Sequence, residues 1–286
     1  MKSGTDKYED VSDSCSLSEI DDSNSAKETN KLILALKADI LTRKELLVKS
    51  EFWDYIRDCL KKHIYMEWGC LNSRPEKNMI LNGTHFTNNI VLFVIGLGSL
   101  EERRESNLSS LFQLAATLAL NDDINIESIY FCDPAFTFVD NYLIFELFMK
   151  YQTHIEIFTG SDLSIPLNTV ISQFKNNIYG RNRKLNFLFF MPHCDRCVFG
   201  MLLHYFSFGT GKDVYIKDNT KIIVWGNNLN TFKTDSHKNF NKKCGYCNLL
   251  LSSLKKTSFK NEYANEKYNS AFNYTFSDLT IYNLPV

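Results

Sequence analysis

The stretch of this sequence richest in reactive side chains is residues 190–195, where an imidazole, a thiol and a carboxylate follow a proline. In Phe-Met-Pro-His-Cys-Asp, the ring of His193 titrates near neutral pH, and Cys194 as a thiolate could act as a nucleophile. His193 and Cys194 are therefore the candidate catalytic residues. No GxSxG elbow or other recognised nucleophile setting surrounds them, so a buried, inert Cys194 beside a hydrogen-bonded His193 fits equally.

Two glycines and a serine follow an earlier apolar run. Gly96, Gly98 and Ser99 come directly after residues 90–95, and glycine lets a backbone turn tightly and approach a ligand closely. A dinucleotide fingerprint would need a third glycine at position 101, which is a glutamate, and a methyltransferase-type opening would need an acid at position 94, which is a valine. The segment satisfies neither motif, and a plain strand-to-helix turn also explains it.

Two more polar residues follow other apolar runs. Asp133 ends Phe-Cys-Asp, and an acid at this place in Rossmann-like folds accepts hydrogen bonds from ribose hydroxyls, although an aspartate before proline caps a turn or helix equally well. Asn227 follows Trp-Gly and could bind a ligand or cap the turn. The candidate ligand-binding residues are Gly96, Gly98, Ser99, Asp133, His193 and Asn227.

The eight cysteines include two Cys-x-x-Cys pairs, Cys194 with Cys197 and Cys244 with Cys247. Four thiolates would make a closed zinc site. However, 46 residues lie between the two pairs, whereas about 15–20 separate them in common four-cysteine zinc patterns. We therefore expect no metal site and, in a long chain without an export signal, reduced thiols.

Short apolar runs that alternate with helical patterns must position these residues. The periodicity predicts strands at 90–95, 128–132, 154–158, 185–191 and 221–225, and helices at 107–120, 138–150, 167–178 and 197–208. Strands that alternate with helices predict a mainly parallel sheet covered on both faces. The carboxyl ends of parallel strands share one edge, so we expect Ser99, Asp133, His193 and Asn227 to converge on one cleft.

Further elements flank this core. Apolar spacing predicts a helix over 30–49 and a second one from Ser50, with Phe52, Trp53, Ile56 and Leu60 on one side. Towards the carboxyl terminus, 227–243 is expected to be a loop, 249–254 a short helix and 272–282 an edge strand. The domain is thus expected to span residues 30–286.

Charge is distributed unevenly along the chain. The formal net charge is −1, which offers no global attraction for nucleic acid or an anionic membrane, and we expect neither as a partner. Residues 1–29 hold eight acids against three lysines, together with many serines and almost no large apolar residue. Such a segment lacks the apolar surface that would offset the entropy of ordering, so we expect a disordered acidic tail.

Several of these motifs, in this order, resemble the "sensitivity to red light reduced" (SRR-like) family. They are Gly-Leu-Gly-Ser at 96–99, Gln-Leu-Ala at 113–115, Asp-Pro-Ala-Phe at 133–136, Met-Pro-His-Cys at 191–194 and Trp-Gly-Asn at 225–227. Glu-Leu-Leu at 45–47 and Phe-Ser-Asp-Leu-Thr at 276–280 resemble the beginning and end of the family pattern. The resemblance covers about residues 40–285.

The resemblance implies an α/β, Rossmann-like three-layer domain with additional N-terminal helices, in a protein of the cytoplasm and nucleus. It further implies regulatory roles: circadian and light signalling in plants, and control of haem synthesis and clock-gene expression in animals. No biochemical activity is attached to the family, so the cofactor and the reaction stay open. Three hypotheses follow: a regulatory protein that binds a nucleotide-type ligand, a transferase-type enzyme using His193, and a pure interaction module with protein partners.

Overall fold

The six predicted strands and a seventh that was not predicted, at 255–258, form one sheet with the order β3-β2-β1-β4-β5-β7-β6. The computed structural model describes residues 21–65, 89–101, 107–176, 185–192, 194–208, 221–227, 255–258, 275–276 and 279–284. The strands are β1 (Asn89–Ile95), β2 (Ile126–Cys132), β3 (His154–Phe158), β4 (Leu185–Met191), β5 (Lys221–Asn227), β6 (Lys255–Ser258) and β7 (Leu279–Leu284). Strands β1 to β5 are parallel, whereas β7 runs antiparallel to β5 and β6 antiparallel to β7.

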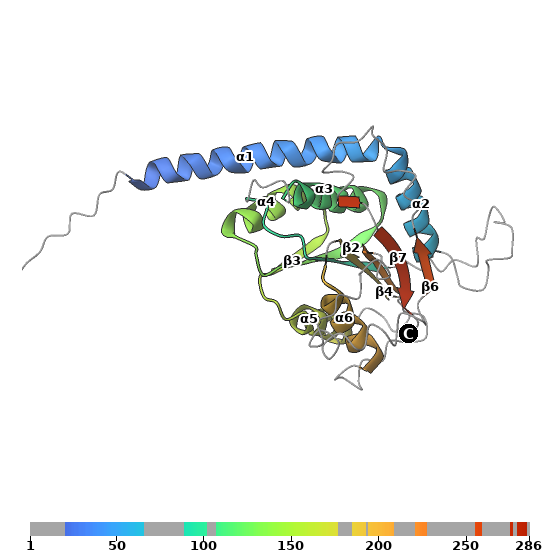
Figure 1. Cartoon of the computed structure of the whole chain (residues 1–286). Helices are drawn as coiled ribbons and strands as arrows, with labels where there is room; N and C mark the ends of the chain where they lie inside the picture. The colour runs from blue at the N-terminus through green and yellow to red at the C-terminus, as the bar shows by residue number, and fades with distance from the viewer. Residues whose placement is uncertain are drawn as a thin grey trace, which may run out of the picture.

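Helices cover both faces of this sheet (Figure 1). On one face lie α3 (Asn107–Asp123) and α4 (Phe138–Phe148), and on the other α5 (Ser164–Asn176) and α6 (Arg196–Phe208). The long helix α1 (Asp21–Val48) lies across the outside of α3 and α4, and α2 (Glu51–Tyr65) turns down beside the sheet. The predicted α/β fold, with a mainly parallel sheet between two layers of helices and added N-terminal helices, is confirmed.

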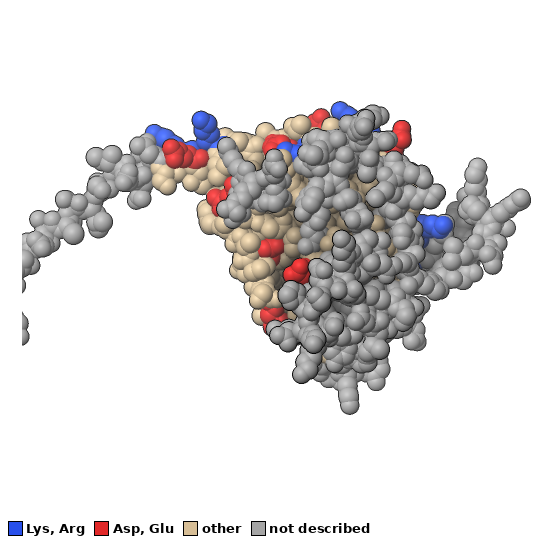
Figure 2. Space-filling view, in the orientation of Figure 1, with Lys and Arg blue, Asp and Glu red and all other residues tan. Residues whose placement is uncertain are grey.

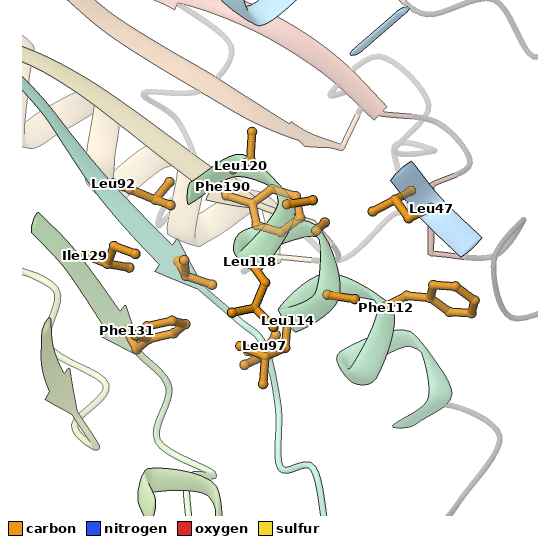
Figure 3. Close-up of a cluster of buried hydrophobic side chains, with 14 of the residues drawn as sticks. Leu47, Leu92, Leu97, Phe112, Leu114, Leu118, Leu120, Ile129, Phe131 and Phe190 are labelled. Atoms are coloured by element: carbon orange, nitrogen blue, oxygen red, sulfur yellow. The ribbon is translucent and has the colours of Figure 1, made fainter. Parts of the chain in front are cut away.

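Each face of the sheet has its own apolar core because successive strand side chains point to opposite faces. In β1, Leu92 and Val94 join the core under α1 to α4, while Val91 and Phe93 join the core under α5 and α6. Figure 3 shows part of the first core, with α3 side chains such as Leu114 and Leu118 over strand side chains such as Leu92 and Phe190. Burial on both faces explains why the strands read as continuous apolar runs.

A serine separates the two N-terminal helices. The Ser50 hydroxyl donates to the Leu47 carbonyl (2.6 Å) and accepts the Trp53 N–H (3.1 Å), so it caps α2 where α1 ends. All four apolar residues predicted to share one side of α2 are buried. The Trp53 ring lies 6.4 Å from that of Trp225, centroid to centroid, and its Nε1 donates to Asp123 (2.8 Å). These contacts tie α2 to β5 and α3.

The structure differs from the sequence predictions at both ends of the chain. Helix α1 begins at Asp21 and so includes residues 21–29, which the sequence placed in the tail; residues 1–20 lie outside the described residues. The strand predicted over 272–282 begins at Leu279, and it is not the edge, because β6 pairs with its outer side. The loop predicted over 227–243 is wrong at Asn227, which is the last residue of β5; the rest of that loop and the helix predicted at 249–254 lie outside the described residues.

Two further properties concern membranes and thiols. Within the described ranges, no helix combines the length and the apolar character needed to cross a membrane. Cys59, Cys132 and Cys194 are free thiols, as predicted. The expectation of reduced thiols is wrong for Cys197, which is disulfide-bonded.

Candidate ligand site at the carboxyl end of the sheet

The residues that follow β1 lie at the point where the strand order reverses. From β1 the chain proceeds outward through β2 and β3, and then returns to place β4 on the other side of β1. In open α/β sheets, ligands bind at such a switch point, outside the carboxyl ends of the strands. Residues 96–101, directly after β1, therefore lie where a ligand site is expected in such a sheet.

Gly96 and Gly98 both adopt the left-handed backbone conformation, with φ of 75° and 76°. Gly96 is also crowded: a Cβ added there would lie 2.5 Å from the Sγ of Cys194. The Gly96 N–H donates to the Cys132 carbonyl (3.3 Å), and the Cys194 thiol donates to the Ile95 carbonyl (3.1 Å). Glycine at 96 is thus required both by the backbone and by the close approach of the segment after β4.

Asp133, which follows β2, binds the glycine segment directly. One carboxylate oxygen accepts the Gly98 N–H (2.8 Å) and the other accepts the Ala135 N–H (2.8 Å). The side chain is buried, so both bonds are shielded from water. Asp133 therefore caps the turn after β2, one of the two roles considered from the sequence, and each oxygen keeps a further lone pair that could accept a ligand hydroxyl.

A second buried carboxylate, Asp140 in α4, holds the next part of the segment and was not among the predicted site residues. One oxygen accepts the Leu100 N–H (2.8 Å), and the other accepts the Thr137 N–H (2.8 Å) while the Thr137 hydroxyl accepts the Asp140 N–H (3.2 Å). This reciprocal pair is a capping box at the start of α4. The Thr-x-x-Asp spacing was a visible signal for the cap, but not for the contact with Leu100.

The remaining described candidates belong to the same cluster. Ser99 is half-buried, and its hydroxyl accepts the Glu101 N–H (3.3 Å). The side-chain amide of Asn227, the last residue of β5, donates to the Cys194 carbonyl (3.4 Å). A continuous chain of contacts thus joins the segments after β1, β2 and β4 to the end of β5 and brings together Gly96, Gly98, Ser99, Asp133, Cys194 and Asn227. His193 lies outside the described residues.

Burial governs the chemistry of the two thiols in this cluster. Burial raises the pKa of the Cys194 thiol far above its usual range, and the carboxylates of Asp133 and Asp195 raise it further. Burial, with a contribution from Asp133, also raises the pKa of Cys132 to about 12. Both thiols are protonated at neutral pH, so neither offers the thiolate that nucleophilic catalysis and metal binding require.

Within the part of the chain that the structure describes, no group of three or more His, Cys, Asp or Glu side chains is placed to hold a metal ion. Cys244 and Cys247 lie outside it. The expectation that the two Cys-x-x-Cys pairs do not form one zinc site therefore stays a prediction.

Comparison with known proteins identifies the family. A family model described as the SRR1 domain matches residues 58–283, from the second half of α2 to β7. No curated protein and no solved structure matches the chain significantly. The matched range contains every element that positions the candidate site and agrees with the resemblance found in the sequence. The chain belongs to the SRR1 domain family.

Proposed function

We propose that this SRR1 domain protein is a regulatory protein that binds a nucleotide-type small molecule at the carboxyl edge of its sheet. The observation that carries the proposal is the fixed conformation of residues 96–100 at the strand-order switch point. Two buried carboxylates, from Asp133 and Asp140, hold alternate backbone amides of this segment. A segment held in this way presents its remaining polar groups in a defined geometry, which lowers the entropic cost of binding.

The chemistry of the cluster favours the sugar of such a ligand over its phosphates. Asp133 and Asp140 place two carboxylates beside residues 96–100, so a phosphate there would meet like charges. Ligand hydroxyls, by contrast, can donate to Asp133, the role that acids take at this position in related folds. In the proposal, Gly96, Gly98 and Ser99 approach the ligand, Asp133 accepts its hydroxyls, and His193 and Asn227 close the site.

The cellular role proposed follows from the family. Regulation of circadian or light signalling, or of haem synthesis, in the cytoplasm and nucleus is what the resemblance supports. If the ligand is converted, we propose His193 as the acid or base, with Asp195 beside it, since Cys194 is protonated at neutral pH.

One observation favours a second candidate, a pure interaction module in which the site no longer binds a ligand. The Cys194 side chain fills the space beside Gly96 and is 5% exposed. In that place the thiol covers the backbone of Gly96, which could otherwise contact a ligand at the switch point. In this alternative, the carboxyl-edge cluster only stabilises the fold, and partner proteins bind elsewhere.

Calorimetric titration separates the two candidates. The purified full chain is titrated with the four ribonucleoside monophosphates and NAD, and small molecules released from it on denaturation are identified by mass spectrometry. Ser99→Trp places an indole over the proposed site, and Ser172→Trp, at an exposed position on α5, is the matched control. Thermal melting verifies that both variants fold.

We expect at least one of these ligands to bind the wild type and Ser172→Trp equally, and Ser99→Trp at least tenfold more weakly. Absence of binding at millimolar concentration together with no released molecule, or equal binding by folded Ser99→Trp, would overturn the ligand proposal and favour the interaction module.

A further inference from the structure

Helix α4 presents a stripe of large apolar side chains to solvent. Phe138, Tyr142, Phe145 and Met149 are 77%, 50%, 47% and 79% exposed. Their spacing of four, three and four residues places all of them on one side of the helix. The opposite side already packs into the core through Leu143, Ile144, Leu147 and others, so α4 is apolar on both sides. Packing among the described residues accounts for only one of these two sides.

Helix α1 extends this stripe. Lys37 of α1 forms an ion pair with Glu146 of α4, so the side of α1 that carries Lys37 faces α4. Leu34 and Leu41 lie three residues before and four residues after Lys37, hence on the same side, and they are 64% and 37% exposed. We call the six residues Leu34, Leu41, Phe138, Tyr142, Phe145 and Met149 the α1–α4 patch. Below the left half of α1, the described surface in Figure 2 is mostly uncharged, with a few acidic side chains.

The size of the patch matches an interface rather than scattered surface residues. At about 200 Å² per ring, the three aromatic side chains alone expose roughly 350 Å², within the range of the largest patch on a typical monomer. Met149 and the two leucines bring the total towards the roughly 800 Å² that each partner buries in a standard interface.

The charges around the patch do not favour a charged partner. Lys37 and Glu146 neutralise each other at its centre, and the Lys150 ammonium lies 4.8 Å from the centre of the Tyr151 ring. A nucleic acid, an acidic peptide or an anionic membrane would need an excess of basic groups here. The complementary surface is therefore apolar and close to neutral, as the patch itself is.

We propose that the α1–α4 patch is the interface of a two-fold symmetric dimer of this chain, with the two α4 helices antiparallel. The four-three-four spacing is the same from either end of α4. A second α4 in the opposite direction therefore presents its stripe residues at matching positions. Phe138 then faces Met149 of the second copy, a sulfur–aromatic contact, and Tyr142 faces Phe145 of the second copy, an aromatic pair. A two-fold interface must be self-complementary in this way.

Sedimentation of the full chain tests the dimer. We expect a monomer–dimer equilibrium with a Kd in the micromolar range or below for the wild type. Phe145→Glu buries a carboxylate near the two-fold axis and should weaken the dimer at least tenfold. Met201→Glu, at a position 50% exposed on α6 away from the patch, is the control and should leave the Kd unchanged. Thermal melting verifies that each variant folds.

A complementary pair of charges makes the test specific for the antiparallel arrangement. In the double variant Tyr142→Lys with Phe145→Glu, each new lysine faces the glutamate of the other copy, so the dimer should recover relative to Phe145→Glu alone. A wild type that stays monomeric at 100 µM or more would overturn the proposal and favour a different apolar partner. Loss of the dimer in Met201→Glu, or no recovery in the double variant, would also overturn it.

Discussion

At the scale of single residues, contacts between backbone and buried side chains define the carboxyl edge of the sheet. The Cys194 thiol occupies the space in which Gly96 lacks a side chain, and Asp133 accepts the Gly98 N–H. Burial keeps the thiol protonated, so Cys194 contributes packing and a hydrogen bond to the Ile95 carbonyl rather than a nucleophile. Both glycines are thus structural requirements, whatever the segment binds.

Gly96→Ala tests this packing. The left-handed backbone costs an L-residue roughly 1–2 kcal/mol, and the collision with Cys194 adds overpacking of roughly 1–3 kcal/mol. We therefore expect the free energy of unfolding, measured by denaturant titration, to fall by about 2–5 kcal/mol.

Two variants serve as controls for Gly96→Ala. Gly160→Ala meets no atom within 4 Å and should change the unfolding free energy by less than about 1 kcal/mol. In a Cys194→Ala background, the steric part of the Gly96→Ala effect should disappear. An equal cost with and without the Cys194 thiol would contradict the contact.

His63 near the end of α2 makes a pH-dependent contribution to stability. Its Nδ1 lies 2.8 Å from the side-chain amide of Asn283, a bond that a neutral ring can accept. Burial, together with Lys62 and Lys221, lowers the pKa of His63. Below pH 6.5 the unfolded chain therefore takes up a proton that the folded chain resists, so this group lowers the unfolding free energy as the pH falls.

We expect the unfolding free energy of the wild type to decrease more steeply between pH 7 and pH 5 than that of His63→Gln, which has no titrating group at position 63. His154→Gln, at an exposed position on β3, is the control and should keep the steep dependence. Parallel pH profiles for the wild type and His63→Gln would show that the pKa of His63 is the same in the folded and unfolded chains.

At the scale of elements, the parallel part of the sheet could be predicted from the sequence, and its antiparallel edge could not. Strands β1, β4 and β5 are apolar at most positions because both faces are covered, which gives a strong signal, whereas β3 at the edge alternates polar and apolar residues. β7 was expected to start earlier, because Phe276 adds apolar character before Leu279. Phe276 instead packs against the Phe52 ring, at 5.1 Å between centroids, a contact between distant segments that local pattern cannot show.

The start of α1 at Asp21 has a similar explanation. Residues 25–29 are mostly exposed, so no apolar periodicity marks them. A helix already anchored further along can extend through such residues at little cost, because propagation is easier than nucleation. The anchored part packs on α3 through residues such as Ile40, which is fully buried.

Ile40→Ala tests whether α1 is an integral part of the domain, since this helix precedes the range that matches the family model. Truncation of a fully buried isoleucine should lower the unfolding free energy by about 2–5 kcal/mol. Leu46→Ala, at a position 44% exposed on the same helix, is the control and should cost less than half as much. Equal, small effects would mean that α1 does not stabilise the domain.

At the scale of the whole molecule, the strand topology predicted where the candidate residues meet. It did not predict which groups their side chains bind. Parallel strands bring Ser99, Asp133 and Asn227 to one edge, as expected from the strand pattern. That Asp133 and Asp140 both bind the backbone of residues 96–100 depends on how α4 packs, and one sequence does not specify this packing. The two proposals also concern separate surfaces, the carboxyl edge and the α1–α4 patch, so either can fail alone.

Amide NMR of the full chain, titrated with the four ribonucleoside monophosphates and NAD, tests the central claim most directly. The claim is that the segments after β1 and β2 and the end of β5 form one ligand site. It predicts that at least one ligand shifts the amides of Gly98, Ser99, Asp133 and Asn227 together, with a single Kd, while those of α5 stay unchanged. Shifts confined to other parts of the domain, or none at millimolar ligand, would contradict it.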